Sequence, residues 1–239
     1  MFKEYAALIH QLTLQHIGSD LSDSQLTQLC DFGDLLLDWN RRLNLTRITD
    51  PHEVILKHFI DSMVIANFIS GATFADLGTG AGFPGVPLKI LRPDLDVVLI
   101  DSLKKKLNFL DVVIKTLDLS GIRTVHDRME DFGRNNHYRS YFDTVSSRAV
   151  ARLPVLLEYA LPVLKINGLF LAPKGSQFED ELFIAKEALS VLGGTVEGIE
   201  QFSFGEGAEH RAVIRIRKIK ETPLLYPRQA GTPTKFPIR

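Results

Sequence analysis

The chain has 239 residues, of which 45% are hydrophobic and 24% are charged, and its formal net charge is −1. This composition is typical of one globular core domain with an extension and excludes a largely disordered chain, while the single cysteine, Cys30, excludes an internal disulfide and any site built from several thiolates. No apolar run approaches the roughly 20 residues of a membrane span and no signal-peptide pattern follows Met1, so we expect a cytoplasmic protein without a membrane partner.

Residues 1–70 predict an N-terminal helical extension. Ser22 and Gln25 form a capping-box signature, and apolar residues recur at helical spacing after it: Leu26, Leu29, Phe32, Leu36 and Leu37. A helix end and turn are expected at 40–46, and another helix at 51–69. No alternation of strand and helix patterns precedes Gly71.

Residues 71–220 predict an α/β core, because short apolar runs alternate there with amphipathic stretches. The expected strands are 74–77, 97–100, 123–126, 144–146 and 169–172, and the expected helices are 86–91, 104–117, 153–164 and 179–192. Two further strand-like runs, 195–204 and 212–219, have no helical pattern between them and are expected to pair as an antiparallel hairpin. The predicted fold is a doubly wound, Rossmann-like sheet that is mostly parallel and ends in this hairpin.

Residues 221–239 predict a basic, proline-rich tail. Four of the eleven prolines lie in the last seventeen residues, and eight Lys and Arg side chains stand against one acid, Glu221, from Arg211 onward. We expect an extended arm on an otherwise acidic body. Such an arm either contacts a polyanion or serves only as a solubilising end.

The most informative stretch is a glycine loop, residues 76–85, between an expected strand and an expected helix. Glycines there let the backbone turn sharply and approach a ligand at a helix N-terminus, so Gly78, Gly80 and Gly82 are candidate binding residues. From Gly80 onward the loop also matches the dinucleotide fingerprint G-x-G-x-x-G. Asp76 favours a different ligand, because a carboxylate repels a pyrophosphate but attracts the ammonium and sulfonium of S-adenosylmethionine. The bland alternative is that Asp76 caps the strand end or the turn.

Two further acidic positions follow the next two expected strands. Asp101 ends the run 97–101, where a carboxylate can accept hydrogen bonds from both hydroxyls of a ribose; this residue alone would suit NAD equally well, or would cap a helix. After the third strand, Met129 is suited to pack on an adenine ring, while an acid or a backbone group reads the exocyclic amine. Spacing does not rank Asp127, Glu130 and Asp131 for that task, and a solvated acidic turn is the alternative.

Several segments resemble those of the bacterial glucose-inhibited-division-B type (RsmG-like) methyltransferases. They are Trp39-Asn40 with Asn44-Leu45-Thr46, residues 57–62, 76–85 and 99–102, and Ser146-Ser147-Arg148-Ala149. The resemblance covers about residues 20–217. It implies a class I methyltransferase fold, S-adenosylmethionine as cofactor, and methylation of guanine N7 in 16S ribosomal RNA. It also implies cofactor contacts at Gly78, Phe83, Met129 with Glu130, and Arg148.

The chemistry of N7 methylation needs no catalytic residue, because the N7 lone pair carries no proton and requires only alignment with the methyl group. The partner that the resemblance implies is 16S ribosomal RNA or the small ribosomal subunit. Methylation of a pyrimidine C5 is disfavoured by the position of Cys30, and methylation of an adenine amine by Ser146-Ser147-Arg148-Ala149 in place of an Asn-Pro-Pro-Tyr-like turn.

Alternatives remain open from the residues alone. A 2′-O or small-molecule methyltransferase would use Lys174 as a base, and a non-catalytic ribosome-binding module would not require the glycine loop. An NAD-dependent oxidoreductase is disfavoured by Asp76. Arg148 suits the cofactor, an RNA phosphate or a purely structural anchor. His58 and Asp61 are spaced like a metal or acid–base pair, but without a third ligand we expect a structural hydrogen bond and no metal.

Overall fold

A computed structural model of the protein describes residues 1–204 and 210–239. The chain forms two compact units, Met1–Phe68 with Thr79–His126, and Ile69–Gly78 with Asp127–Arg239. We call them unit 1 and unit 2 and describe each by itself. None of the described helices combines the length and apolarity that crossing a membrane requires.

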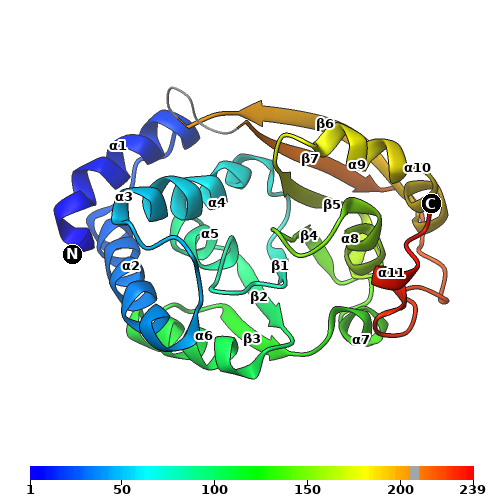
Figure 1. Cartoon of the computed structure of the whole chain (residues 1–239), viewed down its shortest axis with the longest axis horizontal. Coiled ribbons are helices and arrows are strands. Elements are labelled where there is room, and N and C mark those ends of the chain that lie inside the picture. The colour runs from blue at the N-terminus through cyan, green and yellow to red at the C-terminus, as the bar shows by residue number, and fades with distance from the viewer. Residues whose placement is uncertain (205–209) are drawn as a thin grey trace. The chain divides into compact units, whose positions relative to one another are not determined.

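Unit 1 is mainly helical around two parallel strands (Figure 1). Its elements are η1 (Phe2–Tyr5), α1 (Ala6–Ile17), α2 (Asp23–Leu43), α3 (Pro51–Val54), η2 (Ile55–Ile60), α4 (Asp61–Met63), η3 (Val64–Phe68), α5 (Gly85–Leu91), β2 (Asp96–Asp101), α6 (Lys104–Thr116) and β3 (Ile122–His126). The capping box is confirmed, since the Ser22 hydroxyl accepts from Gln25 N and the Gln25 side chain accepts from Ser22 N. The apolar face of α2 buries Leu29, Phe32 and Leu36 in the core.

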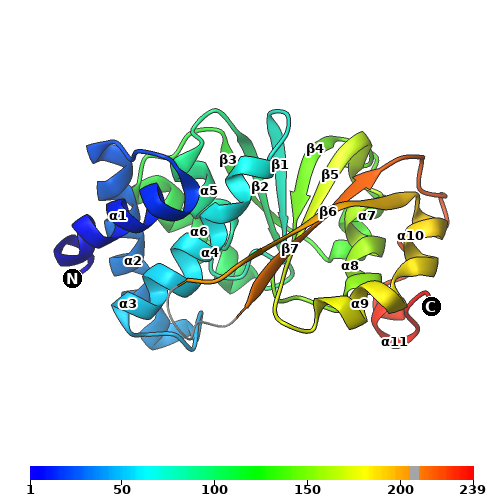
Figure 2. The ribbon, with the colours of Figure 1, turned by 90° about the horizontal axis from the view of Figure 1, so that it is seen from above.

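Unit 2 contains five strands in the order β1-β4-β5-β7-β6. Its elements are β1 (Thr73–Leu77), α7 (Met129–Arg134), β4 (Phe142–Ser146), α8 (Leu153–Ala160), β5 (Leu164–Lys174), α9 (Phe178–Ile184), α10 (Lys186–Leu192), β6 (Gly194–Phe202), β7 (Arg211–Lys218) and α11 (Thr232–Lys235). Strands β1, β4 and β5 are parallel, and β7 runs antiparallel to both β5 and β6. Figure 2 shows α7, α8 and α10 together on one side of these strands. The mostly parallel sheet and its antiparallel hairpin confirm the predicted fold class.

Three predicted helices differ from the observed ones. The helix expected at 153–164 ends at Ala160, and Leu161 beyond it still has helical angles (φ −64°, ψ −36°). Because Pro162 has no N–H to donate to the carbonyl four residues earlier, the helix does not continue, and β5 starts at Leu164. The helix expected at 179–192 is two helices that meet at Ala185, whose ψ of −3° departs from helical geometry. The helix expected at 51–69 is four consecutive helical pieces, of which η2 is a π-helix.

The prediction of an extended C-terminal arm is wrong. Thr222 and Pro233 are buried, a short helix forms at α11, and Arg139 donates to the carbonyl oxygens of Thr222 (2.7 Å) and Tyr226 (2.9 Å). Prolines remove backbone donors but leave every carbonyl as an acceptor, so a proline-rich segment still folds back where a partly buried guanidinium supplies the donors.

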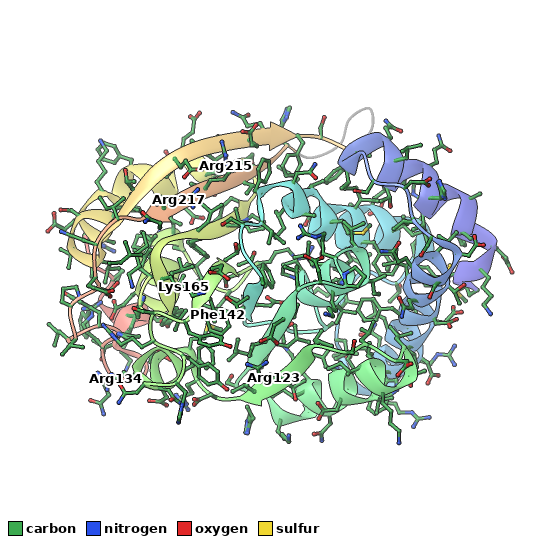
Figure 3. The ribbon with its side chains drawn as sticks, turned by 180° about the vertical axis from the view of Figure 1, so that it is seen from behind. Arg123, Arg134, Phe142, Lys165, Arg215 and Arg217 are labelled. Atoms are coloured by element: carbon green, nitrogen blue, oxygen red, sulfur yellow. The ribbon has the colours of Figure 1, made fainter. Side chains whose placement is uncertain are left out.

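The half-buried carboxylate of Asp143 links three strands of unit 2, and its pKa provides a test. Asp143 accepts from Lys165 (Figure 3) and from the Ala72 and Thr73 backbone N–H groups and the Thr73 hydroxyl. Burial alone would raise the pKa of Asp143, but these hydrogen bonds outweigh it and hold the pKa at about 2, below its ordinary 3.8.

A folded-state pKa below the unfolded value stabilises the protein above pH 4 and ceases to do so as the pH falls toward 2. We expect the wild type to lose about 2 kcal/mol of unfolding free energy across that window through this group. Asp143→Asn should be less stable near neutrality and should lack this part of the acid dependence in urea unfolding. If both proteins lost the same unfolding free energy between pH 4 and pH 2, the low pKa would not belong to Asp143.

Candidate functional site

The carboxyl ends of β1 and β4 lie side by side in unit 2. Asp76 pairs in register with Ser146, and the Ser147 hydroxyl donates to the Leu77 carbonyl at 2.8 Å. Asp76 is fully buried, and Arg148, two residues beyond β4, is half-buried. Parallel strands end at the same edge of a sheet, and that edge is where ligands bind in open α/β folds. The structure therefore brings two of the predicted residues, Asp76 and Arg148, to one edge of the sheet.

Gly78 is the point where three predicted parts of the site meet. Its φ of 74° lies in the left-handed region, and a Cβ added there would lie 2.5 Å from Val150 Cγ2 and 2.7 Å from Met129 Cε. The glycine loop, the start of α7 and the turn after β4 are thus packed around a position that has no room for a side chain. Ala149, within that turn, also has a positive φ of 57°. The sharp turn expected at Gly78 is present, and its approach to a ligand stays a prediction.

In unit 1, Asp101 fixes the following part of the glycine loop. Its Oδ2 accepts from the Gly80 N–H at 3.0 Å and its Oδ1 accepts from the Leu103 N–H at 2.8 Å, while Thr79 N–H donates to the Ile100 carbonyl at 2.9 Å. Asp101 is 6% exposed. A carboxylate offers about four lone-pair positions, so these two hydrogen bonds leave acceptor capacity for a ligand hydroxyl. Asp101 does not cap α6, whose N-cap is Leu103 and has no side-chain cap; it holds the turn before that helix and remains a candidate ribose acceptor.

The remaining loop positions pack into the core of unit 1. Gly80 and Gly82 have φ values of 60° and 97°, and a Cβ on Gly82 would lie 2.8 Å from Val86 Cγ2. The Phe83 ring is buried and stacks on the His58 ring with 4.6 Å between centroids; it also lies 5.2 Å from the Phe32 ring. Since the Phe83 side chain fills this cluster, its backbone is the part suited to contact a ligand.

His58 has a structural partner that the sequence did not indicate. Its Nε2 is 2.8 Å from the Thr46 hydroxyl, and the Asn40 side chain bonds both the N–H and the carbonyl of Thr46. These contacts join segments 39–46 and 57–62, which were singled out separately in the sequence. Across residues 1–204 and 210–239, no group of three or more His, Cys, Asp or Glu side chains is arranged to hold a metal ion.

Glu130 differs from the other candidates because its side chain is bound within the protein. Its Oε1 accepts from the Gly231 N–H at 2.9 Å and from the Tyr159 hydroxyl at 3.2 Å, and the residue is 8% exposed. Sequence reasoning missed Tyr159 and Gly231. The only signal was Glu158-Tyr159, a polar pair inside the otherwise apolar run 153–164.

Comparison with known proteins identifies the family of the chain. Residues 25–214 match the family described as GidB, rRNA small subunit methyltransferase G. The chain is 52% identical over 238 residues to the Ribosomal RNA small subunit methyltransferase G of Desulfitobacterium hafniense, covering 100% of both chains. The chain belongs to this family. It is also 44% identical over 233 residues to the protein of the same name from Clostridium novyi, with 96% of each chain covered.

Membership confirms the predicted family and, with it, the enzyme class and cofactor, a methyltransferase that uses S-adenosylmethionine. A solved structure shows that the fold is shared more widely. A SAM-dependent methyltransferase from Aquifex aeolicus superposes with a TM-score of 0.55 at 17% identity, covering 74% of this chain and 97% of that one. At that identity the likeness concerns the fold alone.

Proposed function

We propose that the protein transfers the methyl group of S-adenosylmethionine to N7 of a guanine in 16S ribosomal RNA, as free RNA or within the small subunit, in the cytoplasm. The structural observation that supports it most is the packing of Gly78 against Met129 and Val150, which joins three predicted contact regions. Similarity over the whole chain to a protein named Ribosomal RNA small subunit methyltransferase G supports 16S ribosomal RNA as the substrate.

The residues present suit the cofactor chemically. The backbone N–H of Gly78 suits its carboxylate, and the buried Asp76 suits its ammonium. The N–H groups of Gly80 and Gly82 already donate to Asp101 and to the Thr79 carbonyl, so these two glycines are proposed to line the site through the close approach of their backbone. Further contacts are proposed for Asp101 with the ribose hydroxyls, the backbone of Phe83, Met129 and Glu130 with the adenine, and Arg148 with the cofactor or an RNA phosphate. When bound, S-adenosylmethionine supplies an electrophilic methyl group. The protein supplies alignment of that methyl with the guanine N7 lone pair.

The alternative of oxygen methylation with Lys174 as a base is disfavoured by the contacts of that lysine. Lys174 Nζ donates to the Glu181 carboxylate at 2.7 Å and to the Ala151 carbonyl at 3.1 Å. An ammonium engaged as a donor to both acceptors is poorly placed to take a proton from a substrate hydroxyl. Guanine N7, which loses no proton, makes no such demand.

The target atom can be tested by the product and by the pH dependence of methyl transfer. We expect a positively charged N7-methylguanine, recognised by RNA cleavage after borohydride and aniline treatment, and a single-turnover rate nearly independent of pH around neutrality. A product resistant to that cleavage, with a rate that rises about tenfold per pH unit, would contradict N7 transfer and favour a general base.

Replacing Asp101 tests the proposed ribose contact. We expect Asp101→Ala to weaken S-adenosylhomocysteine binding by about 1.5–3 kcal/mol, since hydrogen bonds from the ribose to a charged partner are lost and the Gly80 N–H loses its acceptor. Titration calorimetry measures the change. Asp111→Ala is a matched control, because Asp111 also lies in unit 1 but accepts an exposed hydrogen bond from Thr124. Equal affinity of both variants would remove Asp101 from the site.

A further inference from the structure

The C-terminal segment contacts one face of the short helix that begins the proposed adenine-binding region. The Gly231 N–H donates to the Glu130 carboxylate, and Arg134 Nε donates to the Pro227 carbonyl at 2.7 Å. Between them, Gly133 packs directly against Pro227: a Cβ added to Gly133 would lie only 2.5 Å from Pro227 Cγ. Glu130, Gly133 and Arg134 are spaced i, i+3 and i+4 on α7, so they share one helix face. Residues 227–231 therefore contact that face at all three positions, although Arg134 itself stays exposed.

The same segment is anchored on α8. Glu158, which is 0% exposed, accepts from the Arg228 backbone N–H at 2.7 Å and from Arg228 Nε and Nη2 at 2.9 and 2.7 Å. The next residue, Tyr159, donates to Glu130. Adjacent residues of α8 thus hold the segment and the first turn of α7. Figure 1 shows the red C-terminal segment beside α7 and α8.

The Tyr159 hydroxyl is suited to remain a donor. Burial raises its pKa to about 12, and although the Thr234 hydroxyl at 3.5 Å acts in the opposite direction, the negative charge of Glu130 adds to the rise. The Glu130 carboxylate therefore faces two donors, one from α8 and one from the C-terminal segment. With Oε1 engaged by both donors, the Glu130 side chain anchors the start of α7 and so restrains the backbone of Met129 and Glu130.

We propose that residues 222–234, which we call the C-terminal clamp, position Met129 and Glu130 and thereby set the selectivity of the enzyme for the adenine base of its cofactor. The inference rests on the proposed function, which places these two residues at the adenine. Adenine and hypoxanthine differ in hydrogen-bonding pattern: N1 accepts in adenine but carries a proton in hypoxanthine, and the exocyclic donor becomes an acceptor. A backbone held in one position accepts the first pattern and rejects the second.

The test compares S-adenosylhomocysteine with its deaminated counterpart, which carries hypoxanthine, by titration calorimetry on the full chain. We expect the wild type to prefer the adenine ligand, and Tyr159→Phe to reduce that preference by about tenfold through loss of one donor to a carboxylate. Glu130→Ala should reduce it further. Glu130→Gln should restore most of it, because the amide oxygen still accepts from both donors. Leu224→Ser, in the clamp but 86% exposed, is the matched control and should bind as the wild type does.

The outcomes separate the two proposals. Variants that weaken both ligands equally, or leave the preference unchanged, would show the clamp to be structural only and overturn the inference while the cofactor site stands. A wild type that binds S-adenosylhomocysteine without preferring it to the hypoxanthine ligand would have the same meaning. A wild type that binds neither ligand would overturn the proposed site itself and the inference with it. Should Tyr159→Phe fail to fold, the comparison of Glu130→Ala with Glu130→Gln carries the test, since only the alanine removes the acceptor for both donors.

Discussion

Gly78→Val should reduce the affinity for S-adenosylmethionine by more than about a hundredfold, equivalent to about 3 kcal/mol. A valine at φ 74° is strained by about 1–2 kcal/mol, and its Cβ would displace Val150 and the Met129 methyl from 2.5 and 2.7 Å. The added side chain also fills the position where the loop backbone is proposed to approach the cofactor. The loop backbone can then no longer approach the cofactor, and Met129 is displaced from the proposed adenine contact. Both changes weaken binding of the same ligand, so their effects on affinity combine.

The controls for Gly78→Val separate strain from obstruction. Gly18 has nearly the same φ, 73°, but nothing lies within 4 Å of an added Cβ, so Gly18→Val carries the backbone strain without the steric conflict. Thermal unfolding reports the strain in both variants, and titration calorimetry reports binding. A folded Gly78→Val protein that binds as tightly as Gly18→Val would remove Gly78 from the cofactor site.

Arg228→Met should lower the unfolding free energy by about 3–5 kcal/mol, the range for removing one partner of a buried ion pair. The Glu158 side chain is 1% exposed and would keep its charge in the core with one backbone donor left, while the aliphatic part of Arg228 is retained by methionine. Because the clamp loses its anchor on α8, the same variant should also show a weaker preference for adenine over hypoxanthine ligands.

Urea unfolding near neutral pH measures this change. Arg92→Met is the matched control, since Arg92 pairs with Asp94 at 2.6 Å but the two side chains are 36% and 59% exposed; the expected loss is at most about 1 kcal/mol. Equal losses in the two variants would contradict a buried anchor at Glu158. A loss confined to stability, with adenine preference intact, would limit Arg228 to a structural role.

The basic side chains near the C-terminus are arranged differently from what composition alone predicted. Arg215 and Arg217 on β7 (Figure 3) pair with Glu197, Arg228 pairs with Glu158, and Lys218 is fully buried, donating to the Leu164 carbonyl. Burial lowers the pKa of Lys218. These charges have partners inside the fold, so their excess in the sequence does not describe a free basic arm.

The sequence by itself determined the fold class, the family, and the places of the strands and of the glycine loop. Those features are local: an apolar period, a capping box at Ser22, and glycines beside Asp76 all act over a few residues. Tertiary structure alone decided the partners of Glu130 and Glu158, which lie 101 and 70 residues from Gly231 and Arg228. It also turned the expected arm into a clamp, because a proline-rich segment has no periodicity of its own and takes its conformation from buried donors and acceptors far away in the chain.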